Sequence, residues 1–151
     1  MLAVGARAPD FVLRDQNNQE VRLSSYAGRR AVLLVFYPLA FTGICGGELR
    51  DLQASLEYFS AADVEVLTVS VDSVFSHKVW ADREGFSFPL LADFWPHGAV
   101  AASYGVFNAT AGFADRGTFL ISPSGVIVYA SVQGPGSPRE VSAWRDAVAA
   151  L

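Results

Sequence analysis

The only thiol of the 151-residue chain belongs to Cys45, in the segment Tyr37-Pro-Leu-Ala-Phe-Thr-Gly-Ile-Cys45-Gly-Gly-Glu48. An apolar run of strand length precedes this segment and helical spacing follows it, so Cys45 stands where a strand gives way to a helix. A thiol in the first turn of a helix meets unpaired N–H groups and the positive end of the helix dipole, and both favour the reactive thiolate. The position predicts nucleophilic sulfur chemistry; the alternative is the small buried hydrophobic role that is common for free cysteines.

Three neighbours of Cys45 bear on this chemistry. Thr42 precedes it by three residues, and its hydroxyl either points at the sulfur or at a substrate oxygen, or caps the helix. Pro38 ends the preceding strand, because proline lacks the N–H that would continue the ladder. Glu48 falls in the first helical turn, where a carboxylate suits the dipole, and a second role would be to anchor an arginine.

The elements that must position these residues follow from hydrophobic periodicity. Alternating and continuous apolar runs predict strands, and apolar spacings of three and four predict helices. The expected strands are a hairpin of 11–14 with 21–23, buried strands at 31–37 and 64–71, a short extended piece at 89–93, and a hairpin of 117–122 with 126–132.

The expected helices begin with one that carries Leu49, Leu52, Leu56 and Phe59 on its buried face. A second runs over 76–84 with Ser76 as N-cap, and a short one covers 99–104. The last has Pro138 in its first turn and buries Val141, Trp144, Val148 and Leu151. The order predicts an α/β, thioredoxin-like arrangement: a central mixed sheet with helices on both faces and an N-terminal β-hairpin.

Composition limits the classes of protein that fit. A length of 151 residues with 52% hydrophobic and 17% charged residues predicts one globular domain over 1–151. A net charge of −4 argues against nucleic acid as a partner. One cysteine excludes an internal disulfide and multi-cysteine metal sites, so we expect no metal and no cofactor. A free thiol and the lack of a signal-peptide or spanning pattern predict a cytoplasmic protein away from the membrane.

The segment Pro38-Leu-Ala-Phe-Thr42-Gly-Ile-Cys45 resembles the Pro-x-x-x-Thr-x-x-Cys signature of peroxiredoxins, which are thiol peroxidases with a thioredoxin fold. The likeness covers nearly the whole chain, because the opening Gly5-Ala-Arg-Ala-Pro-Asp-Phe-Val-Leu and the flanking strand and helix are in the family's order. The segments Phe88-Pro-Leu-Leu-Ala-Asp-Phe-Trp-Pro-His-Gly and Arg116-Gly-Thr-Phe look most like the one-cysteine alkyl hydroperoxide reductase E type of actinobacteria.

The resemblance implies a role for each residue of the site. Cys45 would supply the attacking thiolate and Thr42 a hydrogen bond to the peroxide, while Pro38 would shield the sulfur from water. Backbone N–H groups near Ile44 and Cys45 would bind the substrate's developing charge, and Ile44 and Glu48 are the expected substrate-binding residues. Arg116 matches the family's active-site arginine and would stabilise the thiolate and the transition state. The alternative interpretation of Arg116 is a surface ion pair.

The resemblance also implies a sulfenic acid on Cys45 that another molecule must reduce. Many relatives have a resolving cysteine five residues after the reactive one, where this chain has Arg50. The expected reductant is an external low-molecular-weight thiol or redoxin, and in an actinobacterial host mycothiol with a mycoredoxin-like protein. Hydrogen peroxide, organic hydroperoxides and peroxynitrite are the expected substrates. The alternative is a peroxide sensor that signals through Cys45 oxidation without sustained turnover.

Other residues suggest weaker hypotheses. His77 and His97 suggest a hydrolase with a cysteine–histidine dyad as an alternative. No signature for an oriented base accompanies them, so both are interpreted as surface or packing residues. Aromatic residues at Phe75, Phe94 and Trp95 suit a contact between subunits, and a homodimer or higher homo-oligomer is therefore expected.

Overall fold

A computed structural model describes residues 1–151, the whole chain. Its centre is a seven-stranded sheet in the order β2-β1-β5-β4-β3-β8-β9. Strands β3, β4 and β5 are parallel, whereas β1, β8 and β9 pair antiparallel with their neighbours. The sheet is therefore mixed, as predicted. The strands are β1 (Val12–Arg14), β2 (Glu20–Arg22), β3 (Ala31–Phe36), β4 (Val64–Ser70), β5 (Leu90–Ala92), β8 (Arg116–Ile121) and β9 (Ile127–Gln133).

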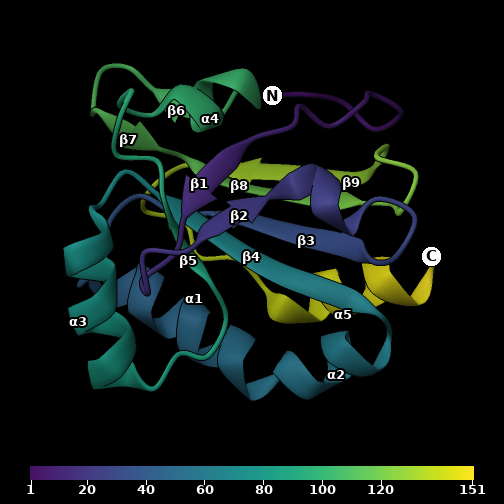
Figure 1. Cartoon of the computed structure of the whole chain (residues 1–151), viewed down its shortest axis with the longest axis horizontal. Helices are drawn as coiled ribbons and strands as arrows, with labels where there is room; N and C mark the ends of the chain where they lie inside the picture. The colour runs from purple at the N-terminus through teal and green to yellow at the C-terminus, as the bar shows by residue number, and fades with distance from the viewer.

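Helices cover both faces of this sheet (Figure 1). A larger layer of helices packs on one face and a smaller layer on the other. The fully buried strand β3 contributes side chains to the cores on both faces, because successive side chains of a strand point to opposite sides. Leu33 and Val35 belong to the core under the first layer, whereas Leu34 and Phe36 belong to the core on the other face. The first layer holds α1 (Gly43–Ala54), α2 (Leu56–Ala61), α3 (Val74–Glu84) and α5 (Val141–Ala149); the second holds the 3-10 helix η1 (Leu23–Tyr26), α4 (Ala99–Ser103) and the short pair β6 (Phe107–Asn108) and β7 (Phe113–Ala114).

Both predicted hairpins are confirmed. In the first, Leu13 lies opposite Val21, and the hairpin joins the main sheet where Arg14 pairs with Ala92. In the second, β8 and β9 are antiparallel neighbours, and β8 also pairs with β3. This pairing brings the beginning of β8, with Arg116, to the end of β3 that leads to Cys45. The carboxyl ends of parallel strands are where sites gather in α/β sheets.

Four details differ from the sequence prediction. The expected single helix is interrupted at Ser55, whose dihedrals (φ −99°, ψ 4°) leave the helix and whose N–H also bonds the Leu52 carbonyl in a 3-10 turn. Helix α3 begins at Val74, because Ser73, and not Ser76, caps it by accepting the Ser76 N–H at 3.2 Å. Two further expectations, on the last helix, are wrong: Pro138 precedes α5, which begins at Val141, and Leu151 is exposed.

Two short strands, β6 and β7, have no counterpart among the predicted elements, because two residues are too few to show a periodicity. None of the helices combines the length and the apolar character that crossing a membrane requires.

Candidate functional site

Cys45 lies in the first turn of α1, as its sequence position predicted. Thr42 is the N-cap residue, with extended dihedrals (φ −106°, ψ 152°), and the first main-chain bond of the helix runs from the Gly46 N–H to the Thr42 carbonyl at 2.8 Å. The N–H groups of Gly43, Ile44 and Cys45 precede that bond and have no partner within the helix. They form a small set of donors where negative charge would develop on sulfur or on a bound oxygen.

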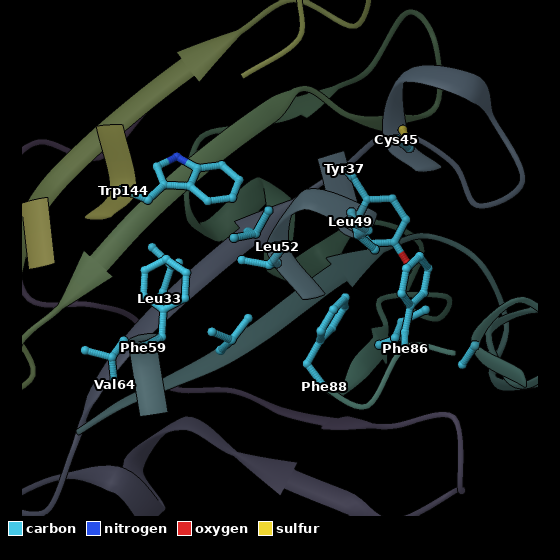
Figure 2. Close-up of a cluster of buried hydrophobic side chains, with 14 of the residues drawn as sticks. Leu33, Tyr37, Cys45, Leu49, Leu52, Phe59, Val64, Phe86, Phe88 and Trp144 are labelled. Carbon is cyan, nitrogen blue, oxygen red and sulfur yellow. The ribbon is translucent and has the colours of Figure 1, made fainter. Parts of the chain in front are cut away.

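The Cys45 side chain is completely buried. It belongs to the core under the larger helical layer, and in Figure 2 its sulfur lies at the margin of that cluster, on the side of Tyr37 and Leu49. A pocket of about 250 Å³ adjoins the same helical turn and is lined by Phe41, Thr42, Gly43, Gly46, Arg50, Trp80, Arg83 and Glu84. A molecule in this pocket lies beside the cysteine turn, but neighbouring groups must move before it touches sulfur.

Thr42 does not cap the helix with its side chain. Its Oγ1 instead donates to the Leu39 carbonyl at 2.7 Å, within the loop that leads into α1. Pro38 is buried at the start of this loop, and Ile44 is 38% exposed. Phe41 adopts a left-handed conformation (φ 64°), which is costly for a residue with a side chain and concentrates at functional sites. The loop is therefore held in one specific conformation.

A buried cluster of one carboxylate and two guanidinium groups lies on the same face of α1, because Glu48 follows Cys45 by three residues. Arg116 Nη1 donates to Glu48 Oε1 at 2.6 Å. Arg139 Nη2 donates to the same oxygen at 2.9 Å, and its Nε and backbone N–H donate to Oε2 at 3.0 and 2.7 Å. All three side chains are at most 3% exposed. Arg116 is thus a buried residue and not a surface ion pair.

The remaining donors of the two arginines determine what each can do. Arg116 Nε donates to the Pro135 carbonyl at 2.9 Å, and its Nη2 makes no hydrogen bond within the chain. Arg139 Nη1 donates to the Gly117 carbonyl and to Thr118 Oγ1, so every polar group of that side chain is engaged. Arg116 therefore keeps one guanidinium nitrogen, Nη2, free to bind a negatively charged group, whereas Arg139 holds the cluster in place.

Electrostatics in the cluster favour the ionised form of Glu48. Burial alone would raise the pKa of Glu48, but the hydrogen bonds and charge of Arg139, together with the charge of Arg116, hold that pKa below its usual value. Burial and the nearby Arg116 lower the pKa of Arg139, opposed mainly by Glu48. Glu48 is thus a carboxylate at neutral pH, and the cluster carries a net positive charge beside Cys45.

Comparison with known proteins identifies the family to which this chain belongs. Residues 4–130 match the model of the AhpC/TSA family. The chain is 56% identical over 151 residues to alkyl hydroperoxide reductase E of Mycobacterium tuberculosis and of Mycobacterium bovis, covering all of this chain and 99% of those proteins. It is also 38% identical to the chloroplastic 2-Cys peroxiredoxin BAS1 of Hordeum vulgare, over 91% of this chain and 70% of that one. This chain is a peroxiredoxin of the AhpC/TSA family.

Solved structures of related proteins have the same fold as this chain. AhpC of Enterococcus faecalis superposes with a TM-score of 0.90 at 30% identity, over 99% of this chain and 92% of that one. The reduced 2-Cys peroxiredoxin of Plasmodium vivax also gives 0.90, at 29% identity over 99% and 82% of the two chains. The thioredoxin-like fold and the thiol-dependent peroxidase activity expected from the sequence are therefore confirmed. The peroxiredoxin resembles alkyl hydroperoxide reductase E over its whole length, and its single cysteine fits a one-cysteine mechanism.

Arg139 is the site residue that sequence reasoning missed. It lies in an irregular segment before α5, outside any periodic pattern. The available signal was Glu48 itself, since a carboxylate on the buried face of a helix needs cationic partners. One arginine was expected at Glu48, and two contact it.

The two histidines of the peroxiredoxin lie in different environments. His97 is exposed, and its Nε2 bonds the Gly112 carbonyl at 2.7 Å, so it is a surface residue. His77 is fully buried, with Nε2 at 2.9 Å from the Tyr37 hydroxyl and 2.8 Å from Ser70 Oγ. Burial lowers the pKa of His77 to about 4 despite the nearby Asp72 charge, so the imidazole is neutral at pH 7. Neither histidine belongs to a hydrolase dyad with Cys45.

Proposed function

We propose that Cys45 is the peroxide-reducing thiol of this peroxiredoxin. Its thiolate attacks one peroxide oxygen, the O–O bond breaks, and the other oxygen leaves as alkoxide or hydroxide and takes up a proton. Sulfur is oxidised by two electrons to the sulfenic acid, and the peroxide is reduced to an alcohol or water. The observation that supports this role is the placement of Cys45 among free helix-start N–H groups beside a buried arginine cluster.

The surrounding groups would stabilise charge along this path. The N–H groups of Ile44 and Cys45 are available for the peroxide oxygens, and the Thr42 hydroxyl reaches the substrate by turning away from the Leu39 carbonyl. Arg116 would direct its free Nη2 at the sulfur or the leaving oxygen. Pro38, buried at the start of the loop, would keep bulk water from the thiol.

Glu48, expected from the sequence to bind substrate, would act indirectly. Both of its oxygens already accept hydrogen bonds from arginine, which leaves little capacity for a peroxide. We infer that Glu48 is a positioning residue that fixes the orientation of Arg116.

The return step would use an external thiol. With no second cysteine in the chain, a thiol from outside condenses with the sulfenic acid, releasing water and forming a mixed disulfide. A second external thiol then frees Cys45 and leaves as a disulfide. Arg50, at the place of a resolving cysteine in many relatives, lines the pocket beside the cysteine turn, which offers an approach for the reductant. Mycothiol with a mycoredoxin-like protein fits an actinobacterial host, and a reducing cytoplasm is the compartment in which this cycle would run.

Intact-mass spectrometry tests the oxidation step. Equimolar hydrogen peroxide should add one oxygen to the wild-type protein within minutes and none to Cys45→Ser. An unreactive Cys45 at neutral pH would refute the proposal. Oxidised protein should then be offered 2-mercaptoethanol, mycothiol and a mycoredoxin in parallel to find which restores the free thiol. Many equivalents of peroxide consumed per protein indicate a catalyst, whereas consumption that stops near one equivalent indicates the sensor alternative.

We also propose that the peroxiredoxin forms a homodimer through an aromatic face. Phe75, Phe94 and Trp95 are 80%, 54% and 81% exposed, and together with Val12 they line one pocket. Exposed aromatic residues grouped in this way are typical of subunit contacts. Light scattering at micromolar concentration should give twice the chain mass, and Trp95→Glu should shift it towards the monomer while Val128→Glu, on the exposed side of β9, should not. A wild-type monomer would refute this contact.

A further inference from the structure

A polar network lies behind the loop that carries Thr42, on elements that the peroxidase mechanism does not use. Asp72 follows β4, and its Oδ2 accepts the Ala40 N–H at 2.8 Å and the Ser70 hydroxyl at 2.6 Å. Ser70 Oγ is in turn 2.8 Å from His77 Nε2, which is 2.9 Å from the Tyr37 hydroxyl. Ser70, His77 and Tyr37 are each at most 1% exposed. The chain of contacts thus connects β3, β4 and α3 to the middle of the catalytic loop.

The loop needs such an anchor. Between Pro38 and Thr42 it has no regular main-chain pairing, and Phe41 within it holds a left-handed conformation that is costly for a residue with a side chain. Such a conformation persists only where surrounding contacts over-determine it. The Phe41 ring packs on Trp80, with centroids 5.9 Å apart, and the backbone one residue earlier is fixed by Asp72. Side-chain and main-chain contacts therefore hold the loop from two sides.

The network itself is preorganised. The Asp72 side chain is 16% exposed, so its bond to Ala40 is largely sheltered from competing water. Ser70 can give its single hydroxyl proton to the carboxylate, and the Asp72 N–H returns a hydrogen bond to Ser70 Oγ at 3.2 Å. The neutral imidazole of His77 occupies the space behind Ser70, and its other nitrogen, Nδ1, is buried without a partner.

We propose that Asp72, held by Ser70 and His77, is a positioning residue that keeps the Pro38–Thr42 loop in the conformation required for peroxide binding at Cys45. This inference rests on the proposed role of Cys45. Asp72 touches neither sulfur nor substrate; it acts through the Ala40 N–H. Because small displacements of reacting groups cost up to about 100-fold in rate, release of this anchor should slow the reaction with peroxide by tenfold or more.

Two rate constants of Cys45 distinguish positioning from a merely structural role. The first is for hydrogen peroxide, which needs the Thr42 loop; the second is for alkylation by iodoacetamide, which needs only an accessible thiolate. In Asp72→Ala we expect the first to fall at least tenfold and the second to fall less than twofold or to rise. Asp72→Asn retains an oxygen that can accept the Ala40 N–H and should recover most of the peroxide rate. Asp82→Ala, an exposed acid on α3, is the matched control and should change neither.

The outcomes separate this inference from the proposed function. Wild-type protein that fails to oxidise at Cys45 would refute the peroxidase role of that residue. An active wild type with a peroxide rate in Asp72→Ala within twofold, or a parallel fall of both rates, would overturn only the positioning role. If Asp72→Ala does not fold, Ser70→Ala decides: a selective loss of the peroxide rate of threefold or more supports the network, and an unchanged rate contradicts it.

Discussion

Glu48→Gln is the substitution with the largest expected effect on stability. Glu48 accepts four hydrogen bonds from Arg116 and Arg139 at 2.6–3.0 Å, in a site with almost no solvent. Glutamine keeps the size but removes the charge and turns an N–H₂ group towards a guanidinium. Two buried cations then face each other without a counter-ion. Breaking a buried pair by removing one partner costs about 3–5 kcal/mol, a large part of the stability of a typical domain.

Urea unfolding at pH 7, followed by tryptophan fluorescence, measures this loss. Glu57→Gln, an exposed acid in the first turn of α2, is the control and should change stability by less than about 0.5 kcal/mol. If imbalance of charge is the cause, Glu48→Gln with Arg139→Gln should be less destabilised than the sum of the single variants. A loss below about 1 kcal/mol for Glu48→Gln would refute this reasoning about the cluster.

The same variant has a signature in pH. The pKa of Glu48 is lowered in the folded protein, so its stabilisation is fully present above the unfolded value of 4.5 and is lost as pH falls through the folded value. The difference between wild type and Glu48→Gln should therefore narrow below about pH 4.5. A difference that stays constant down to pH 3 would show that lost packing, and not lost charge, destabilises the variant.

Three other changes have clear expected outcomes. Arg116→Ala should slow oxidation of Cys45 by hydrogen peroxide about 100-fold or more in stopped-flow measurements, since a charge-assisted donor is lost in a buried site; an unchanged rate would contradict its role. The pKa of His77 is about 4 in the folded protein and 6.5 in the unfolded chain, so His77 should cost the wild type about 3 kcal/mol of stability as pH falls from 6.5 to 4. His77→Gln should lose that much less stability over the same range. Gly117→Ala should cost about 1–3 kcal/mol in thermal unfolding, because a Cβ would approach Val106 Cγ1 to 2.7 Å. Gly47 has open space around it, so Gly47→Ala should stabilise the protein by about 0.5–1 kcal/mol. Equal effects of the two substitutions would contradict the packing argument.

Local patterns in the sequence predicted the parts of the fold that depend on local physics. The buried run 31–37 and the hairpins of 11–14 with 21–23 and of 117–122 with 126–132 each depend on local sequence, and all three are found. Parts that depend on tertiary contacts were missed. The break at Ser55 leaves the spacing of Leu49, Leu52 and Leu56 intact, so periodicity could not show it.

The candidate site divides in the same way. Cys45, Thr42 and Pro38 lie close in sequence, and their spacing identified them. Arg139 is 91 residues from Glu48, and only pairing of β8 beside β3 together with docking of α5 brings the two into contact. Asp72 and Tyr37 are likewise joined by the parallel pairing of β3 with β4. A single sequence does not show which distant residues make contacts of this kind.

The burial of Cys45 explains why the loop in front of it is held so firmly. A sulfur with no exposed surface meets few adventitious thiols and oxidants, and under the proposed mechanism it would react with peroxide only when Thr42 and the helix-start N–H groups bind one correctly. Glu48 holds Arg116 by one hydrogen bond, and Asp72 holds the Ala40 N–H by another. Two anchors built on different elements would thus align the donor groups before substrate arrives, which lowers the reorganisation needed in the transition state. If the anchors act independently, the rate losses of Glu48→Gln and Asp72→Ala should multiply in the double variant; a double variant no slower than the worse single one would show that both act through one shared conformation.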